Sequence, residues 1–236
     1  MNPLGTPEEP MDHNAPPLNP LPPVVWVLTL PLIAMEAVLG LESAGLVGGA
    51  QASGWRMDAV QRFGFSPELM RAMIEAGQYP LAGLARLVTY PLVHGDFTHA
   101  LFVLVILLAL GKMVGEVFRW WAVIVVFMGA TVAGALAYTA LPWAAGALIG
   151  GFAGDYGLIG AFTYILWVRQ VRSGGSQLRA FQLIGFLMGF QLLFGLLFGA
   201  GWYWVAELAG FSAGFLLSFV VSPGGIARLR DQIRRR

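Results

Sequence analysis

Apolar stretches about as long as a lipid bilayer is thick recur along the sequence. A helix that crosses the hydrocarbon core of a bilayer needs about 20 mostly apolar residues. Such helices are predicted at 24–47, 98–117, 120–141, 181–199 and 204–221. A fourth span is predicted at 157–168, which is short unless it starts inside the membrane. With 57% hydrophobic and 11% charged residues and a mean hydropathy of +0.70, the chain has more apolar surface than a water-soluble core absorbs. We therefore predict an all-α membrane protein with six transmembrane helices.

The composition also excludes several classes of function. The sequence contains no cysteine, which excludes disulfides, thiolate catalysis and cysteine-ligated metal centres. Its net charge is only +1, so it offers no basic surface of the kind that binds nucleic acid. We expect neither a cofactor nor a metal ion. The expected partners are the lipid bilayer and other membrane proteins.

Basic residues between the predicted spans set the expected orientation, because loops rich in Lys and Arg usually face the cytoplasm. The segment 142–156 and the turn at Gly201 contain neither residue type. Basic residues gather instead at the end of the second span, after the fourth span and near the C-terminal end: Lys112, Arg119, Arg169, Arg172, Arg179, Arg228, Arg230, Arg234, Arg235 and Arg236. We therefore predict that both termini are cytoplasmic, and we expect the membrane to be a bacterial inner membrane.

Segments of different composition flank the predicted membrane domain at 24–222. Residues 1–23 are rich in proline and lack Lys and Arg. That composition predicts a disordered cytoplasmic tail rather than a cleaved signal peptide. Residues 223–236 are predicted to form a basic cytoplasmic tail.

Residues 48–97 are predicted to form a long outer loop between the first two spans. Charged and apolar residues alternate there at helical spacing, and no stretch is long enough to cross a membrane. We expect one or two short amphipathic helices at the membrane interface, with Trp55 as an aromatic anchor. Glu36, in the first span, is expected either near water or inside the bundle, since carboxylates rarely face lipid.

Two of the three histidines, His94 and His99, stand where this loop leads into the second span. Asp96 or Thr98 is expected to cap the first turn of that helix by accepting from free backbone amides. The two rings should pack against other polar groups, because an ionisable side chain is costly in hydrocarbon. The Gly- and Ala-rich segment 142–156 is predicted as a loop that dips into the protein, because lipid cannot satisfy irregular backbone.

Three motifs together resemble the rhomboid family of intramembrane serine proteases. Residues 85–90 (ARLVTY) and 94–99 (HGDFTH) resemble the WR and H-x4-H-x3-N region of that family. Residues 157–160 (GLIG) resemble its G-x-S-G, and 206–214 (AELAGFSAG) its A-H-x2-G-x3-G. The order and number of predicted spans match as well, so the resemblance covers about 24–222. It implies a rhomboid-like bundle of six transmembrane helices with a long outer loop between the first two.

The residues that the family uses for catalysis are replaced. By this resemblance, the nucleophilic serine falls on Ile159, the general-base histidine on Glu207 and the oxyanion-side asparagine on Val103. His94 and His99 remain on the oxyanion side. A serine protease needs a hydroxyl and an adjacent base. The resemblance therefore implies a catalytically inactive member of the family.

The glycines that pack the family's helices are kept. Gly210 and Gly214 on the sixth span are expected to lie against Gly157 and Gly160 on the fourth, since small residues let helices approach closely. This packing would place Glu207 beside the position of the lost nucleophile.

Other chemistry for the same residues remains open. An active peptidase would need Thr163 to act with Glu207, whereas we expect that hydroxyl to bond back to the carbonyl four residues earlier. A metal ion could be held by two imidazoles and one carboxylate, those of His94, His99 and Glu207. The spacing of the two histidines, however, places their rings on different faces of a helix. Glu207 and His99 could instead form the proton relay of a transporter, but the sequence has no repeat of broken helices that would support a transport path. We favour a buried, hydrogen-bonded pair of Glu207 with a histidine.

Resemblance to inactive members implies that the protein binds transmembrane helices of other membrane proteins and influences their stability or assembly. The alternatives are an active serine-type endopeptidase and a structural subunit of a larger membrane complex. Clients are expected to dock between the second and fifth spans, against Phe102, Phe186 and Phe190. These phenylalanines would serve equally well as a stripe that faces lipid.

Overall fold

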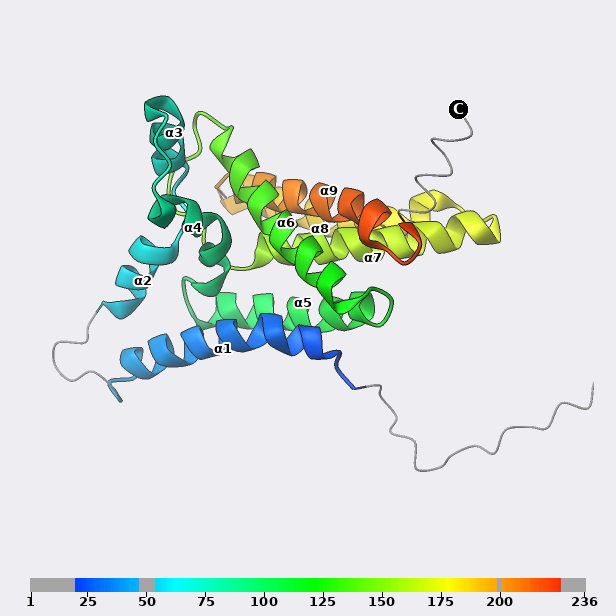
Figure 1. The fold of residues 1–236 in the computed structure, drawn as a ribbon, viewed down its shortest axis with the longest axis horizontal. Helices are drawn as coiled ribbons and strands as arrows, with labels where there is room; N and C mark the ends of the chain where they lie inside the picture. Colours follow the sequence, from blue (N-terminus) through cyan, green and yellow to red (C-terminus); the bar gives the residue numbers. More distant parts are fainter. Residues whose placement is uncertain (1–19, 47–53, 199–200, 226–236) are drawn as a thin grey trace, which may run out of the picture.

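The computed structural model describes residues 20–46, 54–198 and 201–225. Most of both predicted tails and the start of the outer loop lie outside these residues. The described chain is mainly helical (Figure 1). The long helices are α1 (Pro23–Ser43), α5 (Phe97–Gly115), α6 (Trp120–Thr139), α7 (Phe152–Ser173), α8 (Gln182–Phe198) and α9 (Tyr203–Val221). The 3-10 turns η2 (Tyr90–Leu92) and η3 (Gln177–Phe181) precede α5 and α8.

Four helices in the described part of the chain, α1, α5, α6 and α9, are long and apolar enough to cross a membrane. The all-α prediction is confirmed, and helices of this length and composition are those of an integral membrane protein. The other two predicted spans fall on α7, which carries Asp155, Arg169 and Arg172, and on α8, with 17 described residues. The count of six spans therefore stays a prediction.

Helix α7 begins at Phe152, whereas we predicted a loop over 142–156. Glycine and alanine in this stretch suggested irregular backbone, but tertiary packing overrides the local preference. Ala153, Asp155 and Tyr156 are all buried in this first turn and a half. The earlier start of α7 places Asp155 one turn before Ile159, the position of the lost nucleophile.

Helices α7 and α9 touch through their backbones. A side chain on Gly210 or Gly214 of α9 would collide with the backbone of Ala153 or Gly157 on α7. A side chain on Gly160 would collide with the backbone of α9. The predicted packing of these glycines is confirmed. It fixes the register of α9 on α7 and hence the place of Glu207.

The described part of the outer loop contains three short helices rather than the one or two predicted. Residues that begin or end helices divide this segment. Ser66 caps one helix by accepting from the amide of Leu69, at 3.0 Å, Gly77 ends that helix in the left-handed conformation, and Pro80 precedes the next. The helices are α2 (Trp55–Phe63), α3 (Pro67–Ala76) and α4 (Leu81–Thr89).

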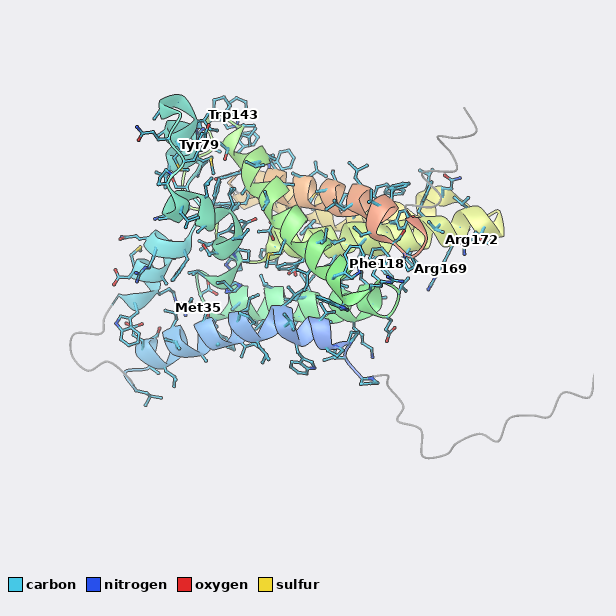
Figure 2. The ribbon with its side chains drawn as sticks, in the orientation of Figure 1. Met35, Tyr79, Phe118, Trp143, Arg169 and Arg172 are labelled. Atoms are coloured by element: carbon cyan, nitrogen blue, oxygen red, sulfur yellow. The ribbon has the colours of Figure 1, made fainter. Side chains whose placement is uncertain are left out.

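The predicted outer and cytoplasmic segments lie at opposite ends of the bundle. Figure 2 shows Met35, Tyr79 and Trp143 at one end and Arg169 and Arg172 at the other. The outer loop and the segment after α6 thus share one end. Arg169 and Arg172, two of the arginines that we predicted to be cytoplasmic, lie at the opposite end.

Hydrogen bonds tie the outer loop to the segment that follows α6. Arg71 donates to the carbonyl oxygens of Leu141, at 2.8 Å, and Ala144, at 2.7 Å. The backbones of Phe65 and Leu148 pair with each other, with N···O distances of 3.0 and 2.7 Å. These bonds hold residues 141–148 in place at the rim of the site described next.

Candidate functional site

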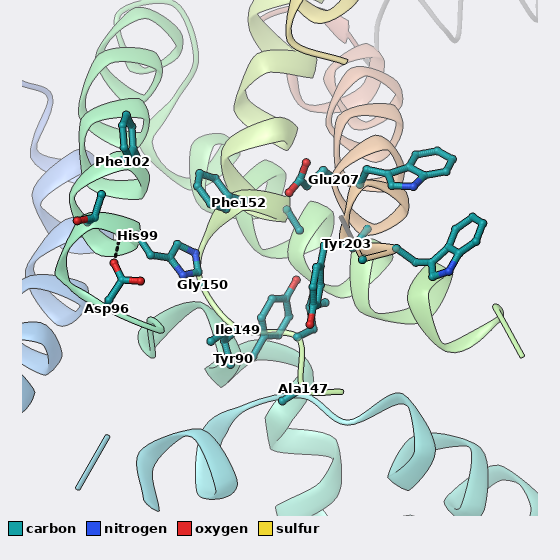
Figure 3. Close-up of a pocket in the computed structure, with 17 residues that line it drawn as sticks. Tyr90, Asp96, His99, Phe102, Ala147, Ile149, Gly150, Phe152, Tyr203 and Glu207 are labelled. Atoms are coloured by element: carbon teal, nitrogen blue, oxygen red, sulfur yellow. Dashed lines mark hydrogen bonds between the residues drawn. The ribbon is translucent and has the colours of Figure 1, made fainter. Parts of the chain in front are cut away.

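A cavity of about 1030 Å³ lies among the first turns of α5, the segment before α7 and the start of α9 (Figure 3). Sites for small ligands usually have volumes of about 300–1,000 Å³, with mostly apolar walls and a few polar groups. The carboxyl and imidazole groups that line this cavity belong to Asp96, His99 and Glu207. Its aromatic lining consists of Tyr90, Phe102, Phe152, Trp202, Tyr203 and Trp204. The cavity therefore has the size and lining of a ligand site.

His99 is held at the start of α5 by two local hydrogen bonds. The side chain of Asp96 accepts from the His99 amide at 2.9 Å, which confirms Asp96 as the helix cap. The backbone amide of Gly95 donates to Nδ1 of the His99 ring at 3.3 Å. The neutral ring therefore carries its proton on Nε2. A side chain at Gly150, whose φ is +83°, would collide with this ring.

His94 lies behind His99 and is fully buried. The two rings meet edge to face, with centroids 5.2 Å apart. Burial, together with the neighbouring His99, lowers the pKa of His94 to about 4. His94 is therefore neutral at physiological pH and acts as a packing group.

The predicted hydrogen bond between Glu207 and a histidine is not formed. Both ring nitrogens of His94 and Nε2 of His99 have no hydrogen-bond partner in the part of the chain that the structure describes. Nδ1 of His99 accepts from Gly95 instead. Phe152 is the physical reason, because its ring stacks on His99 with a centroid distance of 5.1 Å. Figure 3 shows Phe152 between His99 and Glu207.

Glu207 lines the cavity from α9 and is only 7% exposed. It lies close enough to Tyr90, Asp155 and Tyr156 to interact with them electrostatically. Asp155 is fully buried, and neither of its carboxyl oxygens has a hydrogen-bond partner among the described residues. Glu207 is thus a carboxyl group of the cavity wall, whereas Asp155 is not among the described residues that line the cavity.

The residues at the nucleophile and oxyanion positions offer only hydrocarbon. Ile159 is 1% exposed and Val103 is fully buried, and both belong to the main apolar core. Neither is among the described residues that line the cavity. A substrate in the cavity would therefore meet neither a hydroxyl from α7 at position 159 nor an amide donor at position 103.

Thr163 lies one turn beyond Ile159 and is 1% exposed. We predicted that its hydroxyl bonds to the carbonyl four residues earlier, and this is wrong. Its oxygen has no hydrogen-bond partner among the described residues, whereas Thr131 and Ser218 do make such bonds, at 2.8 and 2.7 Å. Thr163 does not line the cavity either, so its hydroxyl is not placed to attack a bound peptide.

The three phenylalanines expected at a docking surface differ in their location. Phe102 lines the cavity from α5 and is 59% exposed. Phe186, on α8, is 70% exposed. The side chain of Phe190 lies outside the described residues. The structure therefore places one of the three in the cavity wall and one on the exposed face of α8.

A metal site made of His94, His99 and Glu207 is not assembled. Over the described ranges, no group of three or more His, Asp or Glu side chains is arranged to hold a metal ion. The two imidazole planes are nearly perpendicular, at 88°. The ring of Phe152 also stacks on the ring of His99.

Two residues that position the site were not predicted to do so. The buried hydroxyl of Tyr90 donates to the carbonyl of Thr131 at 2.9 Å and ties the start of the site to α6. Arg56 donates to the carbonyl of His94 at 2.8 Å. Tyr90 ends one of the motifs that carry the resemblance, which is a usable signal. No spacing rule connects Arg56 with a residue 38 positions away.

Comparison with known proteins agrees with this geometry. A family model described as a rhomboid domain matches residues 82–224 of the 236. The match runs from α4 to just beyond α9 and includes every described residue that lines the cavity. A search of curated proteins gave no match. Since the family model covers more than half of the chain, the chain belongs to the rhomboid family.

Proposed function

We propose that this rhomboid-family protein is proteolytically inactive and binds transmembrane helices of client membrane proteins, influencing their stability or assembly. The observation that carries the proposal is Ile159 at the nucleophile position, with a carboxyl group, Glu207, at the base position. Isoleucine has no atom that attacks a carbonyl carbon. Ile159 is also buried in the apolar core.

The rest of the cavity wall supports the loss of catalysis. Its described lining contains no Ser, Cys or Lys. The hydroxyl groups there belong to Tyr90, Thr98 and Tyr203. That of Tyr90 is engaged with the carbonyl of Thr131, and an alcohol becomes a nucleophile only with an adjacent base. A cavity of this size without a serine or cysteine nucleophile supports binding rather than serine-type hydrolysis.

Lateral docking of a client helix is supported by large exposed apolar side chains on α5 and α8. The main neighbours of α8 are η3 and α7, and Phe102 on α5 keeps 59% of its surface exposed. Phe186 presents a second large apolar surface on α8. The proposed topology has six spans with both termini cytoplasmic. A client would then reach the cavity from within the bilayer.

Photo-crosslinking in native membranes tests the proposal. A photoreactive amino acid at position 102 or 186 of the full chain should form adducts with a co-expressed single-span client. The control is position 136, because Leu136 is 48% exposed on α6 and does not line the cavity.

Adducts with lipid alone at positions 102 and 186 would contradict client docking. Client recovery that is unchanged in a Phe102→Ala/Phe186→Ala variant would also contradict it. One fixed partner, recovered in stoichiometric amount at all three positions, would favour a structural subunit instead.

A further inference from the structure

We propose that the cavity selects client helices that carry a lysine or arginine within the membrane, and that Glu207 receives the basic group. This inference deepens the proposed function and rests on it. It concerns which transmembrane segments are bound, and follows from the charge and the aromatic lining of the cavity.

Only one sign of charge faces the cavity. Its described lining includes Asp96 and Glu207 but neither Lys nor Arg. Glu207 is more than nine-tenths buried. Charges separated from water interact more strongly than exposed charges, because less solvent screens them. A cationic group is therefore the complement of this cavity.

Two arginines of the outer loop are bound to other groups. Arg56 is paired with Glu36, at 2.8 Å, and Arg71 donates to the carbonyls of Leu141 and Ala144. Neither is among the residues that line the cavity. A carboxylate accepts several hydrogen bonds, so contacts of Glu207 within the protein leave it able to accept from an incoming cation.

Aromatic rings complete the complement to a basic side chain. Trp202 and Trp204 lie with their ring centroids 6.1 Å apart, and Tyr203 stacks on Tyr138 at 5.7 Å. Ammonium and guanidinium groups bind to the faces of such rings. The cavity volume of about 1030 Å³ accommodates a long basic side chain with its neighbours, while the remainder of the client helix lies along Phe102.

A client helix fits better than the amine of a lipid. The ammonium group of phosphatidylethanolamine is bonded through a short linker to an anionic phosphate, which Asp96 at the rim would repel. The side chain of lysine or arginine brings no such anion. A basic residue in a transmembrane helix is also costly in lipid, so a client of this kind gains from meeting Glu207.

The test uses the full chain in vesicles of phosphatidylglycerol and a pair of synthetic single-span peptides. Each peptide has a leucine-rich core and a photo-crosslinking group, and the pair differs only in arginine or citrulline at the depth of Glu207. Citrulline keeps the shape of arginine and lacks its charge. We expect the arginine peptide to give a crosslinking yield at least about fivefold higher, the scale of polar pairs between membrane helices.

Variants assign the preference to Glu207. In Glu207→Gln the two peptides should crosslink equally, at the level of the citrulline peptide on the wild type, and Glu207→Asp should keep a preference for arginine. The control is Glu116→Gln, because Glu116 is exposed at the other end of α5 and should not affect the preference. Thermal unfolding of each variant checks that it is folded.

The possible outcomes separate the two proposals. Equal crosslinking of arginine and citrulline peptides to the wild type overturns the selection for basic clients and leaves client binding intact. Crosslinking of neither peptide overturns the proposed function and the inference together. A preference that disappears when phosphatidylethanolamine is added to the vesicles would show that the lipid amine is the occupant, which also overturns the inference.

Discussion

Arg56 of α2 and Glu36 of α1 form a two-point ion pair beside the site. Nη2 lies 2.8 Å from Oε1 and Nη1 lies 3.1 Å from Oε2. The hydrogen bond to Glu36 raises the pKa of the Arg56 guanidinium. Because Nη1 also donates to the carbonyl of His94, a single side chain joins the first span, the outer loop and the segment before α5. Glu36 therefore faces the protein interior, one of the two positions expected from its sequence.

Removing this arginine should destabilise the outer loop on the bundle. Arg56→Leu is expected to lower the free energy of unfolding by about 2–3 kcal/mol, below the range for fully buried pairs, because the Arg56 side chain is 21% exposed. Denaturant unfolding followed by tryptophan fluorescence measures the change. The matched control is Arg62→Leu, an exposed arginine on the same helix. A loss for Arg56→Leu no greater than for Arg62→Leu would refute the anchoring role.

Acid should destabilise the fold through His94. Burial lowers the pKa of His94 from 6.5 to about 4. Between these two values the unfolded chain binds a proton at His94 and the folded chain does not. The contribution of neutral His94 to the free energy of unfolding is therefore complete above pH 6.5 and is lost as the pH falls toward 4. At about 1.4 kcal/mol per pKa unit, the loss between pH 7 and 4.5 is about 2–3 kcal/mol.

The variant His94→Gln should remove this pH dependence, because glutamine does not titrate. Melting temperatures of the wild type and the variant, measured from pH 7 to 4.5, should differ most at pH 7 and converge toward pH 4.5. Parallel curves for the two proteins would show that His94 does not control acid stability.

The backbone contact between α7 and α9 should not tolerate a single added methyl group. Gly214→Ala puts its Cβ against the backbone of Gly157 and is expected to cost at least about 2 kcal/mol, since overpacking a close contact forces the backbone to shift. Gly40→Ala on α1 is the control, because nothing lies within 4 Å of its added Cβ. Unfolding curves for the two variants that coincide would contradict the close packing.

Local patterns in the sequence predicted much of the helical fold. The four helices α1, α5, α6 and α9 follow from the length of their apolar stretches. Asp96 was recognised as a possible cap from its place before an apolar run. The packing glycines of α7 and α9 were recognised from their resemblance to the rhomboid motifs. Each of these features depends on residues close together in the sequence or on one helix face.

The remaining features depend on contacts between distant segments. Phe152, which separates His99 from Glu207, was assigned to a loop, so its stacking was not foreseen. Arg56 takes partners 20 and 38 positions away. The cavity itself is formed from α5, α9 and the segment between α6 and α7. Its lining residues are far apart in the sequence, so no local pattern predicts the cavity.

Intact-mass measurement after treatment of the purified full-length protein with a fluorophosphonate shows whether this rhomboid-family protein lacks serine-type catalysis. The probe phosphonylates an activated hydroxyl and adds a defined mass. We expect an unmodified mass, and no cleavage of a single-span substrate by the protein in vesicles. A stoichiometric adduct and substrate cleavage, both abolished by Thr163→Ala or by Thr98→Val, would contradict this expectation.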